Sequence, residues 1–227
     1  ASSTSSRKVS SSFWVADDPN SNDKFVGVFN IGGNEFVSPE KLLYRSGTVS
    51  RLTDGYGENI DIDLPKGATE LYLIVDDNGD GFNYDHADWI NPVVHLSDGK
   101  ILQLTDLEWE FAKAGWGTGH KNRSVTNNPL NVKGTEYKNG IGTHSQSIIK
   151  FKIPENSKRF TAFAGLDMGG TNHRGDGSTV EFMVSAEDPT PSQEALAVNI
   201  PVDLKALGFS GKCSIRDLWN QKDLGTF

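Results

Sequence analysis

The sequence is poor in the residues that form covalent cross-links or membrane spans. Cys213 is the only cysteine in 227 residues, which excludes an internal disulfide and a cysteine-based metal cluster. No stretch approaches the roughly 20 apolar residues that cross a bilayer, so we expect no membrane span. Lysine and arginine number 22 against 30 acidic residues, a net charge of −8. Nucleic-acid-binding proteins usually carry a basic stripe, so this balance argues against nucleic acid as a partner.

Helical patterns are also scarce, whereas strand and turn patterns recur. Alternating or continuous apolar runs predict strands at 25–29, 60–64, 71–75, 149–153, 180–184 and 196–202. Asp-Gly pairs mark turns at 54–55, 80–81, 98–99 and 176–177. Residues 106–114 could form two helical turns or an extended segment, and 202–207 could hold one helical turn. Short strands between turn signals predict an all-β fold, a β-sandwich of the jelly-roll type.

An acidic segment at 76–88 is the first candidate site. Asp76, Asn78, Asp80 and Gly81 match positions 1, 3, 5 and 6 of an EF-hand loop. However, Ala87 occupies position 12, where the bidentate carboxylate belongs, and no flanking helices are evident. The segment is therefore either a different calcium site or a solvated acidic turn. Five carboxylates within 13 residues would repel one another without a cation, which favours calcium. The candidate ligands are Asp76, Asn78, Asp80, Asp85 and Asp88.

A tryptophan-rich segment followed by a histidine is the second candidate site. Aromatic faces beside polar side chains suit sugars, whose C–H patches pack on rings while hydrogen bonds read their hydroxyls. Trp109 and Trp116 could equally be core residues, because tryptophan is highly buried on average. Glycines on both sides of Trp116 favour its exposure, and His144 could be a ligand contact or a structural histidine. The candidate sugar contacts are Glu108, Trp109, Trp116, Lys121, Asn122, Tyr137 and His144.

Motifs of independent catalysis are missing. The sequence contains no Gly-x-Ser-x-Gly elbow, no His-Glu-x-x-His zinc motif and no glycine-rich phosphate loop. Glycoside hydrolysis needs a pair of carboxyl groups, and nothing in the sequence marks Asp106 or Glu108 as such a pair. We therefore expect that this chain by itself is not an enzyme.

Three motifs in order resemble the hallmark of the NPCBM family of carbohydrate-binding modules. They are Leu-Thr-Asp-Leu-Glu-Trp at 104–109, Gly-Trp-Gly at 115–117 and Gly-Thr-Glu-Tyr-Lys-Asn-Gly-Ile-Gly-Thr-His at 134–144. The resemblance implies a β-sandwich that binds sugars, galactose-containing glycans among them, and it implies calcium sites. In the family, segments like 43–47 and 80–89 follow the Gly-Ile-Gly-Thr-His half, whereas here they precede it. The resemblance therefore predicts a circularly permuted module over 41–186.

The flanks resemble a second family. Segments within 13–40 and 195–227, including Arg-Asp-Leu-Trp at 216–219, are similar to the C-terminal β-domain of α-galactosidase-like glycoside hydrolases. This likeness implies a smaller antiparallel β-domain built by both flanks, with 1–12 as a disordered tail and 187–194 as a linker. The catalytic barrel of that family is absent from this sequence, so we expect a fragment of a larger enzyme.

These observations predict that the chain is a non-catalytic carbohydrate-binding module of a secreted, periplasmic or cell-surface glycoside hydrolase. Its partners would be a galactose-containing glycan and the catalytic domain of the enzyme, with calcium as a structural cofactor. The alternative is a structural accessory domain of an α-galactosidase-like enzyme, without sugar binding of its own.

Overall fold

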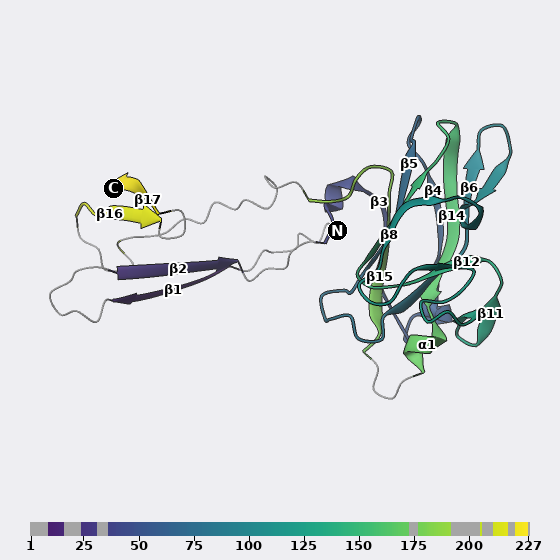
Figure 1. The fold of residues 1–227 in the computed structure, drawn as a ribbon, viewed down its shortest axis with the longest axis horizontal. Coiled ribbons are helices and arrows are strands. Elements are labelled where there is room, and N and C mark those ends of the chain that lie inside the picture. Colours follow the sequence, from purple (N-terminus) through teal and green to yellow (C-terminus); the bar gives the residue numbers. More distant parts are fainter. Residues whose placement is uncertain are drawn as a thin grey trace. The chain divides into compact units, whose positions relative to one another are not determined.

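The computed structural model describes residues 9–15, 24–30, 36–172, 177–191, 205, 211–217 and 221–226. The chain divides into two compact units (Figure 1). The smaller unit comprises Ala1–Asn34 and Ser192–Phe227, and the larger comprises Glu35–Pro191. Among the described residues, no helix has the length and apolar character needed to cross a membrane.

The larger unit is a sandwich of two antiparallel sheets (Figure 1). In order, the first sheet contains β3 (Leu42–Ser50), β15 (Thr179–Ser185), β5 (Glu70–Asp76), β13 (Ser147–Lys152) and β8 (Trp109–Lys113). The second contains β4 (Gly57–Asp63), β14 (Ser157–Leu166), β6 (His86–Leu96), β12 (Gly140–His144) and β9 (His120–Lys121), with β7 (Ile101–Gln103) paired to β6. The predicted all-β sandwich is confirmed.

Small elements cover the outer face of the second sheet and connect the strands. A hairpin of β10 (Leu130–Val132) and β11 (Thr135–Tyr137) packs there through Leu130 and Val132, which contact Ile90 of β6. The helices are short: η1 (Pro39–Lys41), η2 (Asp54–Tyr56), η3 (Leu104–Asp106) and α1 (Met168–Thr171). Because a hairpin and α1 cover β6, residues on both faces of this strand are buried.

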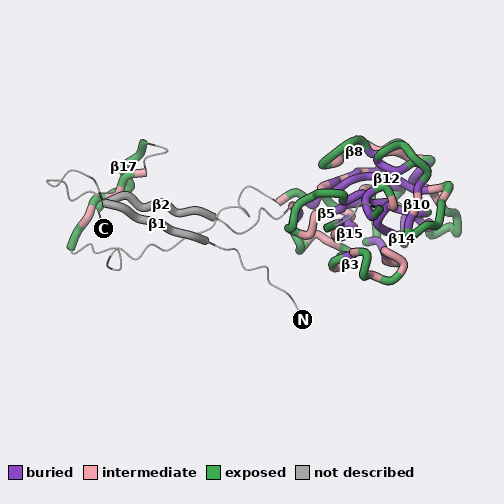
Figure 2. The backbone as a smooth tube through the Cα atoms, turned by 90° about the horizontal axis from the view of Figure 1, so that it is seen from below, coloured by how far each residue is buried: buried purple, intermediate pink, exposed green. Residues whose placement is uncertain are grey.

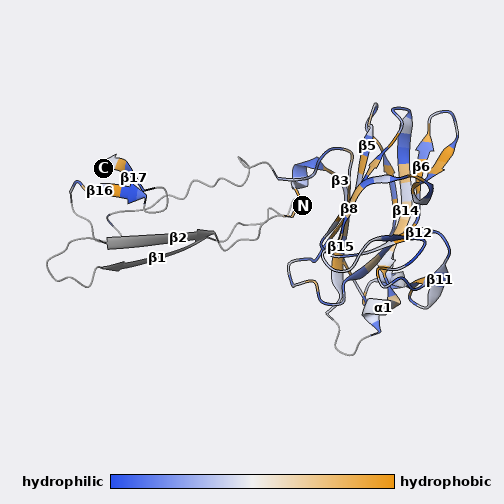
Figure 3. Cartoon of the chain, viewed as in Figure 1, coloured by the Kyte–Doolittle hydropathy of each residue, from blue (hydrophilic) through white to orange (hydrophobic). Residues whose placement is uncertain are grey.

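The core lies between the two sheets, where buried residues gather in Figure 2. Trp89 of β6 meets Phe182 of β15 edge to face, with ring centroids 5.2 Å apart. The apolar run of β5 is buried throughout, as its sequence predicted. Figure 3 shows hydrophobic segments on strands such as β14 and β15. Each large apolar side chain buried here contributes roughly 1.5–3 kcal/mol, so the sandwich is stabilised mainly by burial.

Most strand predictions are confirmed. The segments 25–29, 60–64, 71–75, 149–153 and 180–184 largely coincide with strands. The extended alternative was correct for 106–114, where β8 follows η3 and pairs with β13 instead of forming a helix. The predicted strand 196–202 lies outside the described residues, and so does the predicted turn 202–207 except for Lys205.

Strands from the two halves of the sequence alternate within each sheet. The first half supplies β5, which pairs with β13 and β15 of the second half. It also supplies β6, which pairs with β12 and β14. The acidic segment and the tryptophan-rich segment therefore belong to one sandwich.

The smaller unit contains two antiparallel pairs. One pair is β1 (Val9–Val15) with β2 (Lys24–Asn30), and the other is β16 (Ser214–Asp217) with β17 (Lys222–Thr226). Residues 9–12 therefore form the start of β1, because they pair with β2, and are not part of the tail predicted for 1–12.

The larger unit extends beyond the predicted limits of the module, 41 and 186. The backbone N–H of Ser38 donates to the carbonyl of Pro189 at 2.8 Å. Lys41 Nζ donates to the carbonyl of Asp188 at 2.8 Å. These bonds tie both flanks of the module to each other, so residues 187–191 belong to the larger unit.

Candidate functional site

Trp116 lies on the loop that joins β8 of the first sheet to β9 of the second. The loop passes close to the turn between β12 and β13, where the Gly115 N–H donates to the His144 carbonyl at 3.4 Å. A Cβ atom at Gly115 would lie 2.3 Å from the Ser145 carbonyl oxygen. Only glycine permits this approach, which brings the neighbouring Trp116 against β12.

The Trp116 indole belongs to an aromatic cluster, defined here as Phe82, His86, Trp116 and His144, in which Phe82 and Trp116 are the two exposed members. Trp116 stacks on His86 with centroids 5.6 Å apart and planes inclined by 28°. His144 lies 5.5 Å from Trp116 and 6.1 Å from Phe82. Both histidines are buried, whereas Trp116 remains 50% exposed. The two predicted contacts Trp116 and His144 are thus brought together.

His144 is held in a defined orientation. Its Nδ1 lies 2.6 Å from the carbonyl oxygen of Ser145, so Nδ1 carries the proton and donates it to that carbonyl. Burial lowers the pKa of the imidazole below its usual value. The ring is therefore neutral at pH 7, and Nε2 is left as a hydrogen-bond acceptor.

Glu108, Trp109 and Lys121 form a second group beside β9. Lys121 Nζ lies 5.0 Å from the centroid of Trp109 and 3.4 Å from Glu108 Oε1. It also donates to the Leu107 carbonyl at 2.5 Å. Trp109 packs edge-on against the core residue Phe151, with ring centroids 6.4 Å apart. Trp109 therefore belongs partly to the core and serves as a support for Lys121.

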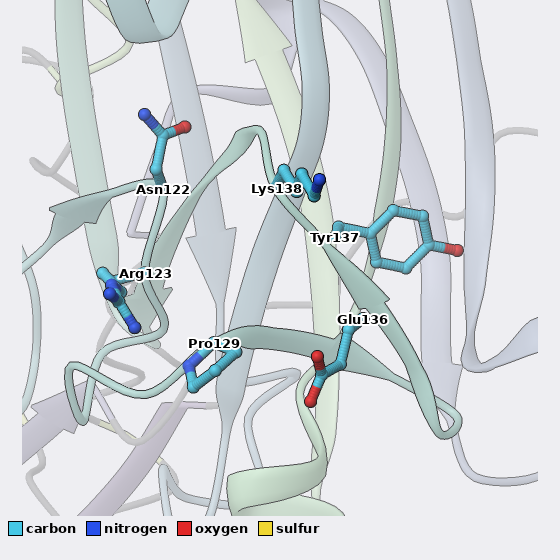
Figure 4. Close-up of a pocket in the computed structure, with 6 residues that line it drawn as sticks. All are labelled: Asn122, Arg123, Pro129, Glu136, Tyr137 and Lys138. Atoms are coloured by element: carbon cyan, nitrogen blue, oxygen red, sulfur yellow. The ribbon is translucent and has the colours of Figure 1, made fainter.

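Asn122 and Tyr137 line a cavity of about 590 Å³ (Figure 4). The Gly140 N–H donates to Asn122 Oδ1 at 3.2 Å, which fixes this amide at the start of β12. Four lining residues were missed by the sequence reasoning: Arg123, Pro129, Glu136 and Lys138. Arg123, Glu136 and Lys138 are each adjacent in sequence to a predicted contact, and this adjacency was the only signal that could have identified them.

The seven predicted sugar contacts thus form three separate groups. These are Trp116 with His144, then Glu108, Trp109 and Lys121, and finally Asn122 with Tyr137. Asn122 lies beside Gly140 at one end of β12, and Trp116 lies beside His144 at the other. Four residues of strand separate these ends, about 13 Å.

The first three predicted calcium ligands bond to protein groups at the surface. Gln146 Nε2 donates to Asp76 Oδ1 at 3.3 Å, and Thr48 Oγ1 donates to Asn78 Oδ1 at 2.9 Å. Thr179 Oγ1 donates to Asp80 Oδ2 at 2.6 Å. These oxygens serve as acceptors within the protein, and they do not converge with Asp88.

Asp85 joins three elements at one end of the sandwich. Ser145 Oγ donates to its Oδ2 at 2.7 Å, and the Thr179 N–H donates to its Oδ1 at 3.2 Å. Burial raises the pKa of Asp85 to about 7 against the opposing effect of these two bonds. Asp85 therefore links β6 to the β12–β13 turn and to β15.

Asp88 is fully buried on the outer face of the second sheet, beside Asp167. Burial, and then the nearby Asp167, raise its pKa well above the usual range. No donor reaches either Asp88 oxygen with full hydrogen-bond geometry, although the Asn131 N–H, which donates to Asp167 Oδ2 at 2.9 Å, lies close enough to oppose the rise in the Asp88 pKa. The buried Oδ1 of Asn131 also lacks a partner. The glycines of the two adjacent strands, Gly142 and Gly165, face Asp88.

The residues around Asp88 fit a hard cation, although the five predicted ligands do not come together. Within the described ranges, no group of three or more His, Cys, Asp or Glu side chains could hold a metal ion. Two carboxylates and an amide oxygen without a donor match calcium chemistry, which uses carboxylate and carbonyl oxygens. Asp167 and Asn131 were not predicted, because nothing in their sequence spacing connects them to 76–88.

The larger unit is thus an all-β sandwich that presents a half-exposed tryptophan on the loop between its two sheets. The chain belongs to the NPCBM/NEW2 domain family, whose model matches residues 14–95 and 100–201. This is a family of non-catalytic carbohydrate-binding modules.

The chain also resembles part of a characterised enzyme. It is 43% identical over 70 residues to α-1,3-galactosidase B of Akkermansia muciniphila. The match covers 30% of this chain and 8% of the enzyme, so the chain spans only a small part of that relative. No solved structure matches the chain.

Proposed function

We propose that the larger unit binds galactose-containing glycans on the exposed ring of Trp116. The observation that carries this proposal is the aromatic cluster: Trp116 is half exposed while its ring is stacked on the buried His86. A ring already fixed in position loses little conformational entropy when a ligand packs on it. A pyranose offers its C–H patch to such a surface.

His144 supplies the polar part of the proposed contact. Its neutral Nε2 can accept a hydrogen bond from a sugar hydroxyl, because Nδ1 already donates to Ser145. One ring and one acceptor give few favourable contacts, so single-site affinity should be weak. Glu108, Lys121, Asn122 and Tyr137 lie further along the same edge and would contact other rings of a longer glycan.

Calorimetric titration of galactosides tests this assignment. We expect Trp116→Ala to abolish measurable binding with only a small fall in the melting temperature, because half of this ring is already exposed. Phe111→Ala is the matched control, since Phe111 is 44% exposed on β8 and lies outside the aromatic cluster. Unchanged affinity in the double variant Trp116→Ala, His144→Ala would reject this site. Absence of galactoside binding in the unmodified chain would favour the structural accessory role.

We also propose that calcium stabilises the module, held by Asp88 and Asp167 with Asn131 Oδ1. The support is the pair of buried carboxyl groups, one of which has no donor. A divalent cation would remove the repulsion between two ionised carboxylates and coordinate the Asp88 and Asn131 oxygens, which lack well-formed hydrogen bonds within the protein.

Finally, we propose that the chain is part of a larger α-galactosidase-like glycoside hydrolase that is secreted, periplasmic or on the cell surface. The match to α-1,3-galactosidase B supports this, as does the resemblance of 13–40 and 195–227 to a glycosidase β-domain. The alternation of strands from the two halves is consistent with a permuted module. Sequencing the adjacent coding region tests the proposal, because a catalytic barrel should be encoded there.

A further inference from the structure

Arg123 and Lys138 differ from the neighbouring cations because no acidic group neutralises them. Lys121 and Lys133, which lie nearby in the sequence, each pair with a carboxylate at 3.4 Å. The side chains of Arg123 and Lys138 form neither an ion pair nor a hydrogen bond with the described part of the chain. In a chain with a net charge of −8, two unpaired cations on one cavity indicate a place for an anion.

Both cations line the cavity of about 590 Å³. Figure 4 shows Arg123 with Asn122 on one side, and Lys138 with Glu136 and Tyr137 on the other. Glu136 is the one acidic residue among the six that line it, so the lining has a balance of one positive charge. Every lining residue except Tyr137 is exposed, so the cavity is an open depression at the surface that an anion can enter from solvent.

The backbone on each side of the cavity is fixed by hydrogen bonds. The Gly142 N–H donates to the Arg123 carbonyl at 3.1 Å, and the Asn122 N–H donates to the Gly140 carbonyl at 2.6 Å. Next to Lys138, the Asn139 amide accepts from Thr105 Oγ1 at 2.6 Å. The backbone from which both cationic side chains project is thus held in place, whereas the side chains themselves are exposed and would be ordered by a ligand.

We propose that this cavity binds the anionic group of an acidic sugar, either a carboxylate or a sulfate ester, through Arg123 and Lys138. The inference rests on the proposed sugar-binding function and names its ligand more closely. A guanidinium offers two parallel N–H groups that match the paired oxygens of a carboxylate or sulfate. Asn122 uses Oδ1 to accept from Gly140, so its amide NH₂ can still donate to a sugar hydroxyl. Glu136 opposes the anion and would limit the affinity.

Titration with three sugars tests the inference: lactose, lactose with a 3′-sialic acid, and lactose with a 3′-sulfate. We expect one or both anionic sugars to bind about twofold to fivefold tighter than lactose, a size typical of exposed ion pairs. The sialic acid carries a carboxylate and the 3′-sulfate is a sulfate ester, so the affinities of these two sugars show which anionic group the cavity prefers. The preference should weaken when the salt concentration rises from 0.05 M to 0.5 M, because salt screens exposed charges.

The double variant Arg123→Gln, Lys138→Gln should lose the preference while it binds lactose as before. Lys66→Gln, Lys158→Gln is the matched control, since both lysines are exposed and neither lines the cavity. Glu136→Gln should strengthen the anionic preference.

Equal affinity for all three sugars, or a preference that survives in the double variant, would overturn this inference and leave the proposed function intact. Absence of binding to every sugar would reject the proposed function, and this inference with it.

Discussion

The indole of Trp116 stacks on the imidazole of His86, with ring centroids 5.6 Å apart and planes 28° from parallel. The two residues lie 30 positions apart, one on the β8–β9 loop and one at the start of β6 (116 − 86 = 30). The buried His86 ring therefore packs under the exposed indole of Trp116. This contact fixes the orientation of the indole face that a sugar would contact.

The first prediction concerns this stacking. His86→Ala should weaken galactoside binding about threefold to tenfold, because the indole loses its support and must be ordered when the ligand binds. His86→Phe retains a flat ring and should keep most of the affinity. Calorimetric titration measures both variants, and near-ultraviolet circular dichroism reports the environment of Trp116. Equal affinity of His86→Ala and the unmodified chain would show that the stacking does not matter for binding.

The second prediction concerns calcium. At a calcium concentration 100 times the dissociation constant, the unmodified chain should gain about 2.7 kcal/mol of stability. Asp88→Asn should abolish this gain, and in EDTA it should be no less stable than the unmodified chain, because it removes one of two buried carboxyl groups. Asp80→Asn, which lies on the exposed acidic loop, is the control and should still respond. Identical thermal melts in EDTA and in calcium would reject the site.

The third prediction is a pH dependence of stability that arises from Asp85. Burial raises its pKa to about 7 in the folded chain, whereas an unfolded aspartate titrates near pH 4. Between these values the folded state keeps a proton that the unfolded state has lost. The contribution to stability is therefore complete below about pH 4 and is lost as the pH rises through about 7, with a slope of at most about 1.4 kcal/mol per pH unit.

Urea unfolding of the unmodified chain and of Asp85→Asn at several values between pH 4 and pH 8 isolates this effect. The stability difference between them should change across the window, because asparagine does not titrate. Parallel stability curves would show that Asp85 is ionised in the folded chain throughout. Asp88 also has a raised pKa, but it contributes equally to both proteins and cancels in the difference.

The fourth prediction concerns the loop that carries Arg123. A Cβ atom at Gly142 would lie 2.4 Å from the Arg123 carbonyl oxygen and 2.4 Å from Ser124 Cα. Gly142→Ala should therefore displace backbone and destabilise the chain by about 1–3 kcal/mol in urea unfolding. Gly177→Ala is the control, because no heavy atom lies within 4 Å of its Cβ position. If the two variants were equally stable, the loop would not be packed as described.

The sequence by itself determined the fold class and the family. Alternating apolar residues place side chains on opposite faces of a strand, so segments such as 60–64 and 180–184 could be assigned without a structure. The helical alternative for 106–114 was decided only by tertiary pairing, because β8 gains its hydrogen bonds from β13. Local propensity carries no information about a distant partner strand.

The sequence identified candidate residues of the site but not their arrangement in space. The sequence motifs named Trp116 and His144 among the candidate contacts, and the structure places their ring centroids 5.5 Å apart. The stacking of Trp116 on His86, the burial of Asp88 beside Asp167 and the placement of Arg123 and Lys138 on one cavity were decided by the tertiary structure. Each of these brings together residues from separate strands or loops. Such contacts depend on sheet register and on close approach at glycines, and neither can be derived from the spacing of residues along one chain.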